Sequence, residues 1–517
     1  MPKRTFVDMP KSSLVQTEDE RDRALISGLD AVLPELLKLN NVPGMNIALA
    51  RHGEIVWEGA YGYADATRHV ATTPETVFRS GSIGKTYTAG AIMQLVEQGV
   101  IRLEDPINTP LPFEVENPLG GPEITIFHLL THTSGLGGDS ASGVFGNTRP
   151  LGETVRSNFS RDEQPLMGAV PTWAVPTGEQ GIYSNLGIAT LGLIVELVNP
   201  EQLSFSDYVE RKIMNPLGMT STQYPPAQSK EYVQPEIWER MSTGYNPMGN
   251  VWIPTPLVYF EEFPAGGFVS IPREYLRYIM AMMNGGSLGE VRILKKETVS
   301  RMLTPQLEGT INWLGSRERQ GLVWRLRDWD TLGRAFWHTG AHMFGWRTMG
   351  IAWPGHDTAV VFACNSWSAV GKMRMPGVDT FIESWLLAEP PVVPPLPEDM
   401  DNLAWKASYL RGLLFVEAYR YGVGLPEKIG LAEAKRLASE AVTETWSGGD
   451  SLWDPQAFVR GVSDMNEVPP TRKGIHDFAN SDRMQVTLKE VQRIYPYLVT
   501  VQQNSANLAG LLAEPAE

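Results

Sequence analysis

Apolar positions recur with two different spacings near the start of the chain. Residues 22–40 carry apolar side chains at helical spacing, and Asn41 and Pro43 end that pattern. Residues 45–65 contain two apolar runs joined by a turn at 51–54, which includes a glycine. The pattern therefore predicts a long helix followed by a β-hairpin.

The next 300 residues change between strand and helix patterns. A short strand at 77–79 leads into residues 80–99, whose apolar side chains share one helix face. Residues 105–260 are rich in Pro, Gly, Ser and Thr, and residues 265–400 return to strand patterns. The expected elements are helices near 124–132, 185–198 and 204–215, strands at 321–326, 335–340, 345–353 and 358–365, and a helix at 377–388. Strands and helices on both sides of a helical block predict one α/β domain interrupted by an insertion.

This pattern divides the chain into four segments. Residues 1–25 are predicted to be a polar N-terminal tail, and residues 26–389 the α/β domain, with its helical insertion at about 105–260. Residues 390–400 are predicted to be a linker, because the stretch PPVVPPLP holds five prolines in eight residues and favours stiff, extended chain. Residues 401–517 are predicted to be mostly helical.

Composition narrows the class of protein. Hydrophobic residues make up 42% of the 517 residues and charged residues 20%, which suits a packed core. The 44 basic and 59 acidic residues give a net charge of −15, which argues against binding to nucleic acid or to an anionic membrane surface. We find no run of 18 apolar residues and no apolar core of a signal peptide, so we expect neither a membrane span nor export, and favour a cytoplasmic protein. The single cysteine, Cys364, excludes an intramolecular disulfide and is expected to pack in a buried strand.

Ser82 and Lys85 are the first residues that could carry chemistry. They lie three positions apart where a strand gives way to a helix, so the amine can reach the hydroxyl on the same helix face. A neutral amine beside a serine can take its proton, and the helix N-terminus can stabilise negative charge that develops there. The same segment resembles the end of a phosphate-binding loop, but Arg79 stands where that loop needs a glycine, so nucleotide binding is not expected.

Two further motifs occur once each. Tyr183 and Asn185 form a Tyr-x-Asn before an apolar helix, where a phenol could relay a proton and an amide could hold the lysine or a substrate carbonyl. A plain helix start is the alternative, because Ser184 or Asn185 would serve as N-cap. His338 and Gly340 form the only His-x-Gly, at a strand end where small residues would let a substrate lie alongside, or simply an exposed turn.

Two histidine pairs spaced four residues apart raise the question of a metal site. His128 and His132 have the spacing of a zinc helix, but Leu129 stands where the catalytic glutamate of such a helix would be. His338 and His342 lie on either side of a turn. Neither pair has a cysteine cluster or a suitably spaced acidic ligand beside it, so we expect no metal and no cofactor. The pair 128/132 is interpreted as a structural hydrogen-bonding element.

Taken together, the order Ser-x-x-Lys, Tyr-x-Asn, His-x-Gly resembles the serine β-lactamase and penicillin-binding superfamily. Within it the chain looks most like the class C β-lactamase-like group, which includes family VIII carboxylesterases, D-aminopeptidases and D-amino-acid amidases. Similar segments include ITIFHLLTHTSGL (124–136), IMNPLGMTST (213–222), PAGGFVSIPREYLRYIMAMMNGG (264–286) and VRILKKETVSRMLTPQ (291–306). The resemblance covers about 30–390. It implies an α/β (α+β) fold with an antiparallel sheet flanked by helices and an inserted all-helical subdomain, followed here by the mostly helical C-terminal region.

The resemblance also implies a role for each motif residue. Ser82 would be the acylated nucleophile, Lys85 its proton acceptor and Tyr183 the base that serves the leaving group and later water. Asn185 would position these groups, and the backbone N–H groups of Ser82 and Ala341 would form the oxyanion hole.

His338 stands where true β-lactamases have a lysine. A near-neutral imidazole holds a substrate carboxylate less firmly than an ammonium group, so β-lactamase activity is expected to be incidental.

The leading expectation is a metal-independent serine hydrolase that cleaves an intracellular small-molecule ester or amide through an acyl-enzyme, with esterase activity favoured. The alternatives are a D-amino-acid peptidase or amidase, an acyltransferase, or a non-catalytic penicillin-binding-like sensor. Eight tryptophans between 313 and 385 suggest an apolar acyl pocket, although most of them could be core. The residues predicted to bind substrate are Thr339, Gly340, Trp337 and Trp346. Residues 401–517 could cap the site or form an interface, so a homo-oligomer stays open.

Overall fold

The structure is a computed structural model that describes residues 9–40, 42–137, 143–144, 149–159, 172–227, 229–248, 251–255, 259–307, 318–329, 332–342, 345–366, 382, 386 and 455–466. The expected linker at 390–400 lies outside these residues. So do the expected helix at 377–388, apart from residues 382 and 386, and the region 401–517, apart from 455–466.

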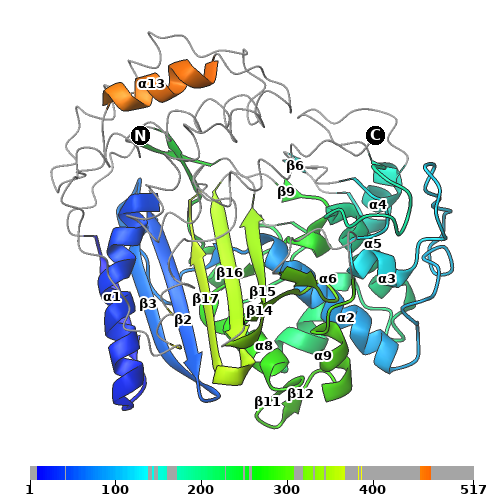
Figure 1. Ribbon diagram of the computed structural model, residues 1–517, viewed down its shortest axis with the longest axis horizontal. Helices are drawn as coiled ribbons and strands as arrows, with labels where there is room; N and C mark the ends of the chain where they lie inside the picture. The colour runs from blue at the N-terminus through cyan, green and yellow to red at the C-terminus, as the bar shows by residue number, and fades with distance from the viewer. Residues whose placement is uncertain are drawn as a thin grey trace.

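One antiparallel sheet forms the centre of the described part (Figure 1). Its strand order is β1 (Lys11–Val15), β3 (Glu54–Asp65), β2 (Gly44–Arg51), β17 (Thr358–Cys364), β16 (Trp346–Trp353), β15 (Gly333–His342), β14 (Arg325–Trp329) and β13 (Glu318–Gln320), with β4 (Val70–Ala71) paired to β3. Because β17 pairs with β2, the strands that follow the helical block lie beside the N-terminal hairpin.

Alternation along the strands gives the sheet two apolar faces. In β2, Ile47 and Leu49 belong to the core on one side, while Ala48 and Ala50 belong to the core on the other. The first core includes side chains of α1 (Glu20–Asn40), and the second includes side chains of α2 (Lys85–Glu97) and α8 (Pro272–Met283). Cys364 is buried in the first core, as predicted, and burial raises the pKa of its thiol to about 11.

Short helices and ladders complete the described part. The remaining helices are α3 (Ile126–Leu130), α4 (Leu151–Phe159), α5 (Asn185–Val198), α6 (Phe205–Val209), α7 (Pro235–Trp238), α9 (Lys296–Met302) and α13 (Pro455–Asn466), with a π-helical turn at Glu210–Met214 and 3₁₀ turns at Gly81–Gly84, Phe263–Ala265 and Pro354–His356. The two-stranded ladders are β5 (Phe78–Arg79) with β10 (Val269–Ser270), β6 (Gly143–Val144) with β9 (Tyr259–Phe260), β7 (Tyr245–Met248) with β8 (Val251–Pro254), and β11 (Ser287–Leu288) with β12 (Val291–Arg292).

The predicted fold class is confirmed: an antiparallel sheet is flanked by helices, with a largely helical block between its two halves. The N-terminal segment differs from the expected tail. Lys11–Val15 pairs with β3 as an edge strand, and α1 already begins at Glu20. Every side chain of β1 is exposed, so its sequence lacks the apolar alternation that would have predicted a strand.

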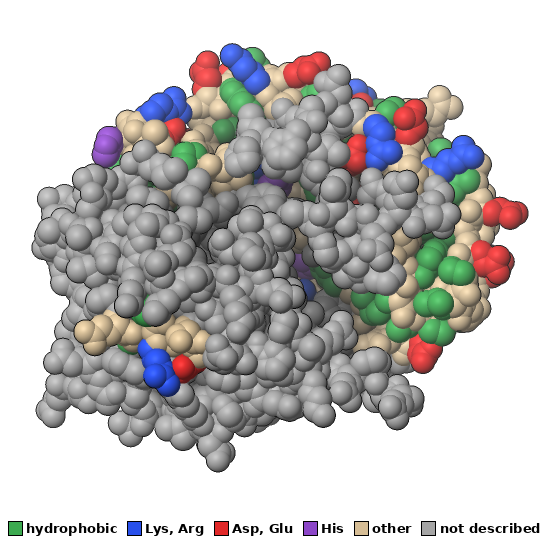
Figure 2. Space-filling view, turned by 90° about the horizontal axis from the view of Figure 1, so that it is seen from above, with side chains coloured by type: hydrophobic (Ala, Val, Ile, Leu, Met, Phe, Trp, Pro, Cys, Tyr) green, Lys and Arg blue, Asp and Glu red, His purple; other side chains and the backbone are tan. Residues whose placement is uncertain are grey.

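Charged side chains of the described residues lie along part of the rim of the molecule in Figure 2. On the face that Figure 2 shows, Lys and Arg side chains are interspersed with Asp and Glu side chains around the rim, and histidines are visible at depth near the middle. No helix among the described residues is both long and apolar enough to cross a membrane.

Candidate active site

Ser82 lies in a tight turn between β5 and α2. The turn is a 3₁₀ helix over Gly81–Gly84, and Gly81 takes a positive φ of 61°. A Cβ atom on Gly81 would lie 2.7 Å from the backbone of Ala341 in β15, so only glycine allows the two segments to approach this closely. The turn thus brings the backbone of Ser82 beside that of Ala341.

Lys85 begins α2 and is fully buried, with 0% of its surface exposed. Its Nζ lies 3.1 Å from Ser82 Oγ, 2.5 Å from Asn185 Oδ1 and 2.6 Å from the Ala265 carbonyl oxygen. The last two partners can only accept a hydrogen bond, whereas the serine hydroxyl can also donate one. A neutral amine can therefore give its two N–H groups to Asn185 and Ala265 and direct its lone pair at Ser82.

Tyr183 and Asn185 stand on either side of the N-cap of α5. The cap is Ser184, whose Oγ accepts from the Gly187 N–H at 3.1 Å. Both interpretations of this motif therefore hold: Ser184 starts the helix, and Asn185 contacts Lys85. The Tyr183 ring has its centroid 4.7 Å from Lys85 Nζ.

His132 also lies against Tyr183. The two ring centroids are 4.7 Å apart, and His132 Nδ1 accepts from the Ser184 N–H at 3.3 Å. His128 completes the capping box of α3 with Thr125. Both histidines thus make structural hydrogen bonds, as predicted, and the sequence did not reveal that one of them adjoins Tyr183.

His338 lies in β15, the strand that passes the turn carrying Ser82. It is 1% exposed, and its Nδ1–H donates to the Thr339 carbonyl at 2.7 Å, which leaves Nε2 as the acceptor. This burial contradicts the alternative of an exposed turn. Among the described residues, β14 pairs with β15 only as far as Trp337, so no strand covers that edge of β15 from His338 to His342.

Burial keeps both inner histidines neutral. Desolvation, helped by the charge of Arg325, holds the pKa of His338 well below its usual value. Desolvation likewise lowers the pKa of His132 well below its usual value. At neutral pH these imidazoles carry no charge, so the fixed positive charge of the site comes from other groups.

These depressed pKa values make stability depend on pH. Below about pH 6.5 the unfolded chain binds protons at these histidines that the folded chain does not bind. The free energy of unfolding should therefore be highest above about pH 6.5 and fall as the pH falls, by up to about 1.4 kcal/mol per pH unit for each histidine. Urea unfolding of His132→Asn should show a shallower decline between about pH 6.5 and 5. The exposed His69→Asn is the control, and equal slopes in wild type and His132→Asn would contradict the prediction.

Gly340 is the second place where only glycine fits. A Cβ atom there would lie 1.9 Å from the Ser80 carbonyl oxygen, which already accepts from Thr348 Oγ1 at 2.5 Å. We expect Gly340→Ala to push β15 away from the turn that carries Ser82 and to destabilise the fold by about 1–3 kcal/mol. Thermal unfolding measures the loss. Gly152→Ala in α4 is the control: its Cβ would lie no closer than 3.7 Å to a neighbour, Leu193 of α5, so it should be neutral or slightly stabilising. A Gly340→Ala protein as stable as wild type would contradict this close approach.

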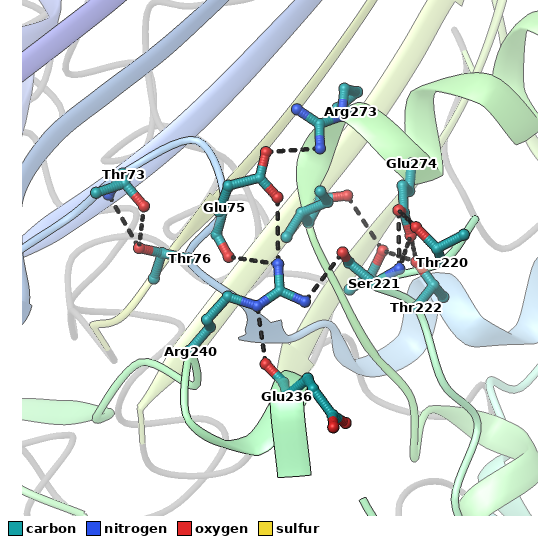
Figure 3. Close-up of polar contacts among 12 residues, drawn as sticks. Thr73, Glu75, Thr76, Thr220, Ser221, Thr222, Glu236, Arg240, Arg273 and Glu274 are labelled. Atoms are coloured by element: carbon teal, nitrogen blue, oxygen red, sulfur yellow. Dashed lines mark hydrogen bonds and ion pairs between the residues drawn. The ribbon is translucent and has the colours of Figure 1, made fainter. Parts of the chain in front are cut away.

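A polar cluster fixes the segment that leads into Ser82 (Figure 3). Glu75 accepts from Arg240 at 3.2 Å and from Arg273 at 2.7 Å, and Arg240 also donates to Ser221 Oγ at 3.1 Å. The buried Glu274 accepts from the Ser221 N–H at 2.8 Å. These bonds join the chain before β5 to the segment around 221–240 and to the start of α8.

The predicted pocket tryptophans are both buried. Trp337 is 2% exposed and lies against the guanidinium groups of Arg325 and Arg327, at 5.0 and 5.6 Å. Trp346 is also 2% exposed, stacks under Arg79 at 5.0 Å and donates to Ser242 Oγ at 3.0 Å. Their role in substrate binding stays a prediction, as do those of the buried Thr339 and of Gly340.

The structure therefore brings together Ser82, Lys85, Asn185 and Tyr183, and places the backbone of Ala341 beside the turn that carries Ser82. The sequence did not reveal the Ala265 carbonyl or Arg325 as neighbours of these residues. Ala265 lies in the PAGG stretch quoted for the resemblance, but the residue types there did not indicate a hydrogen-bond acceptor. No cluster of three His, Cys, Asp or Glu side chains that could hold a metal occurs within the described residues.

An antiparallel sheet with a helical block, and a serine and lysine at their junction, is the plan of β-lactamase-like proteins. Residues 29–376, more than half of the chain, match the family described as Beta-lactamase, and the chain belongs to this family. The solved structure of an octameric penicillin-binding protein homologue from Pyrococcus abyssi is similar, with a TM-score of 0.56 and 22% identity over 74% of this chain and 81% of that one. The structure of a class C β-lactamase gives a TM-score of 0.55 and 18% identity over 72% of this chain and 98% of that one.

Curated relatives match a shorter part of the chain. Esterase EstB of Burkholderia gladioli is 32% identical over 235 residues, which is 44% of this chain and 59% of the relative. Protein flp of Staphylococcus aureus (strain N315) is 28% identical over 238 residues, 46% of this chain and 43% of the relative. These alignments thus cover less than two thirds of either relative.

Proposed function

We propose that this chain is a serine hydrolase that cleaves a small-molecule carboxylic ester through an acyl-enzyme on Ser82. The observation that carries the proposal is the buried amine of Lys85, 3.1 Å from Ser82 Oγ and held by Asn185 and Ala265. Burial disfavours the charged form of an amine, and two acceptor-only partners leave its lone pair for the serine proton. The roles of the other site residues are proposed relative to Ser82 and Lys85.

In the first half-reaction, Lys85 Nζ takes the proton of Ser82 as Oγ bonds to the ester carbon. The backbone N–H groups of Ser82 and Ala341 stabilise the oxyanion, and this role is supported by the close approach of Gly81 to Ala341. The proton then passes by way of Tyr183 to the departing alcohol oxygen as the ester bond breaks.

In the second half-reaction, water bonds to the acyl carbon while Tyr183 takes its proton. The bond from Ser82 Oγ to the acyl carbon breaks, the proton returns to Oγ, and a carboxylic acid leaves. Asn185 holds Lys85 throughout. The neutral His338 lies on the strand edge that we assign to the substrate.

The preference for an ester is supported by the likeness to a protein named esterase. It is also supported by the neutral His338, since no fixed charge at that position binds the carboxylate of a penicillin-like substrate. An ester further demands less protonation of its leaving group than an amide.

A fluorophosphonate probe and a substrate panel test this function. The full-length protein is treated with the probe and assayed with p-nitrophenyl butyrate, D- and L-alanine p-nitroanilide and nitrocefin, with Ser82→Ala as the blank. We expect the wild type to be labelled and to turn over the ester fastest. Faster cleavage of the D-alanine anilide than of the ester would favour an amidase over an esterase. A wild type that is neither labelled nor active would refute the proposal of a serine hydrolase.

A further inference from the structure

Arg325 places a buried guanidinium group beside Tyr183. It is 9% exposed, and its Cζ lies 6.0 Å from the centre of the Tyr183 ring and 5.0 Å from that of the Trp337 ring. An arginine stays charged at neutral pH even where burial lowers its pKa, as it does here. Burying a charged group away from water is energetically unfavourable, so a buried arginine beside Tyr183 calls for an explanation.

The backbone around Arg325 holds this position firmly. Arg325 starts β14, opposite Trp337, at the point beyond which no described strand pairs with that edge of β15. Two residues earlier, Val323 takes a positive φ of 68°, and its N–H donates to the Leu130 carbonyl at 2.8 Å. A β-branched residue adopts this conformation only where the surroundings impose it, so the turn is fixed against the segment that carries His132.

Arg325 is also the group whose charge does not change in the proposed reaction. Lys85 must be neutral to accept the serine proton, and burial keeps His132 and His338 neutral. Among the described residues, the charged or titratable groups around Tyr183 are Lys85 from α2, His132 from the turn after α3 and Arg325 from β14. The negative charge of Glu318 in β13 also favours the charged form of Arg325 and so raises its pKa, against the larger effect of burial.

We propose that Arg325 is a positioning residue that stabilises the phenolate of Tyr183 and so keeps it ready to take a proton from the deacylating water. The inference rests on the proposed function. In the step it supports, the water oxygen bonds to the acyl carbon and its proton goes to the phenolate oxygen. When the bond to Ser82 Oγ breaks, the same proton passes to Oγ, and the phenolate beside Arg325 is restored.

Coulomb's law gives the size of the effect. With the 6.0 Å between Arg325 Cζ and the centre of the Tyr183 ring taken as the charge separation, and an effective dielectric constant of about 20, a unit charge moves the pKa of its partner by roughly one to two units. Removal of the charge should therefore shift the acidic limb of the pH profile of kcat upward by about one to two units. At pH values on the acidic side of the limb, kcat of the variant without the charge should be about tenfold or more below that of wild type, while KM changes little.

The test compares three variants of the full chain with p-nitrophenyl butyrate as the probe. Arg325→Met removes the charge and keeps the apolar length of the side chain, and Arg325→Lys restores a charge. Arg327→Met is the matched control: Arg327 lies on the same strand, also stacks on Trp337, and pairs with Glu318 at 2.7 Å. We expect only Arg325→Met to shift the limb, with Arg325→Lys recovering most of the loss. A limb that stays in place in a folded Arg325→Met protein, or that moves equally in Arg327→Met, overturns the inference.

A second measurement needs no arginine variant. Tyrosinate absorbance is titrated in the wild type and in Tyr183→Phe, and the difference reports Tyr183 alone. We expect this residue to ionise well below the usual tyrosine pKa of about 10, and ionisation at or above that value overturns the inference. Fluorophosphonate labelling separates the two claims. If the wild type is labelled but the limb of Arg325→Met does not shift, only the role of Arg325 is refuted, whereas an unlabelled and inactive wild type refutes the hydrolase.

Discussion

Ser82→Ala is expected to lower kcat/KM for p-nitrophenyl butyrate by about 10⁴- to 10⁶-fold and to abolish labelling by a fluorophosphonate. The loss is this large because no other group can form the acyl-enzyme once the hydroxyl is gone. Binding and oxyanion stabilisation alone leave only a small residual rate over water. Steady-state kinetics and labelling at a single protein concentration measure both effects.

Ser80→Ala is the matched control for this prediction. Ser80 is buried two residues earlier, and its hydroxyl donates to the Phe78 carbonyl at 3.3 Å. Its removal should leave labelling intact and change kcat/KM by no more than a few-fold. Equal labelling of Ser82→Ala and wild type would show that the nucleophile lies elsewhere.

Lys85→Met is expected to lower kcat/KM by about 10²- to 10⁴-fold, the usual contribution of a general base. It should also destabilise the fold by about 1–3 kcal/mol, because the Asn185 and Ala265 oxygens lose their shared donor. Lys85→Arg separates charge from proton transfer. A guanidinium keeps a donor in place and cannot be deprotonated, so we expect its activity to stay low.

The rate of fluorophosphonate labelling and the thermal unfolding midpoint measure these two losses independently. Lys212→Met, at a partly exposed lysine paired with Glu201, should change neither. Full activity in Lys85→Arg would refute the role of Lys85 as proton acceptor.

The central pair of the site could be predicted from the sequence because it is local. Ser82 and Lys85 are neighbours on one helical turn, so their spacing alone brings the amine to the hydroxyl. Likewise, the apolar runs of β2 and β17 predicted strands because both faces of each strand meet a core. The Tyr-x-Asn motif left open whether Asn185 holds Lys85 or a substrate carbonyl, because the two segments are 100 residues apart in the sequence, and the structure shows the contact with Lys85.

The remaining features depend on tertiary structure. Arg325 stands in the stretch GLVWRLRDW, which indicates a strand and not a charge beside a tyrosine from another element. The Ala265 carbonyl contributes through its backbone, which residue type does not encode. The β1 strand was missed because it gains backbone hydrogen bonds without burying any side chain.

The pairing of β17 with β2 affects when the protein can fold. Residues 44–51 leave the ribosome long before residues 358–364. One edge of β2 therefore has no partner strand until β17 is synthesised, some 300 residues later. Contacts between such distant segments slow folding, and an open strand edge is a site for association with other chains. A nascent chain that already carries Ser82, Lys85 and Tyr183 still lacks the strand that completes its central sheet, so we expect competence for catalysis to appear late in synthesis and all at once.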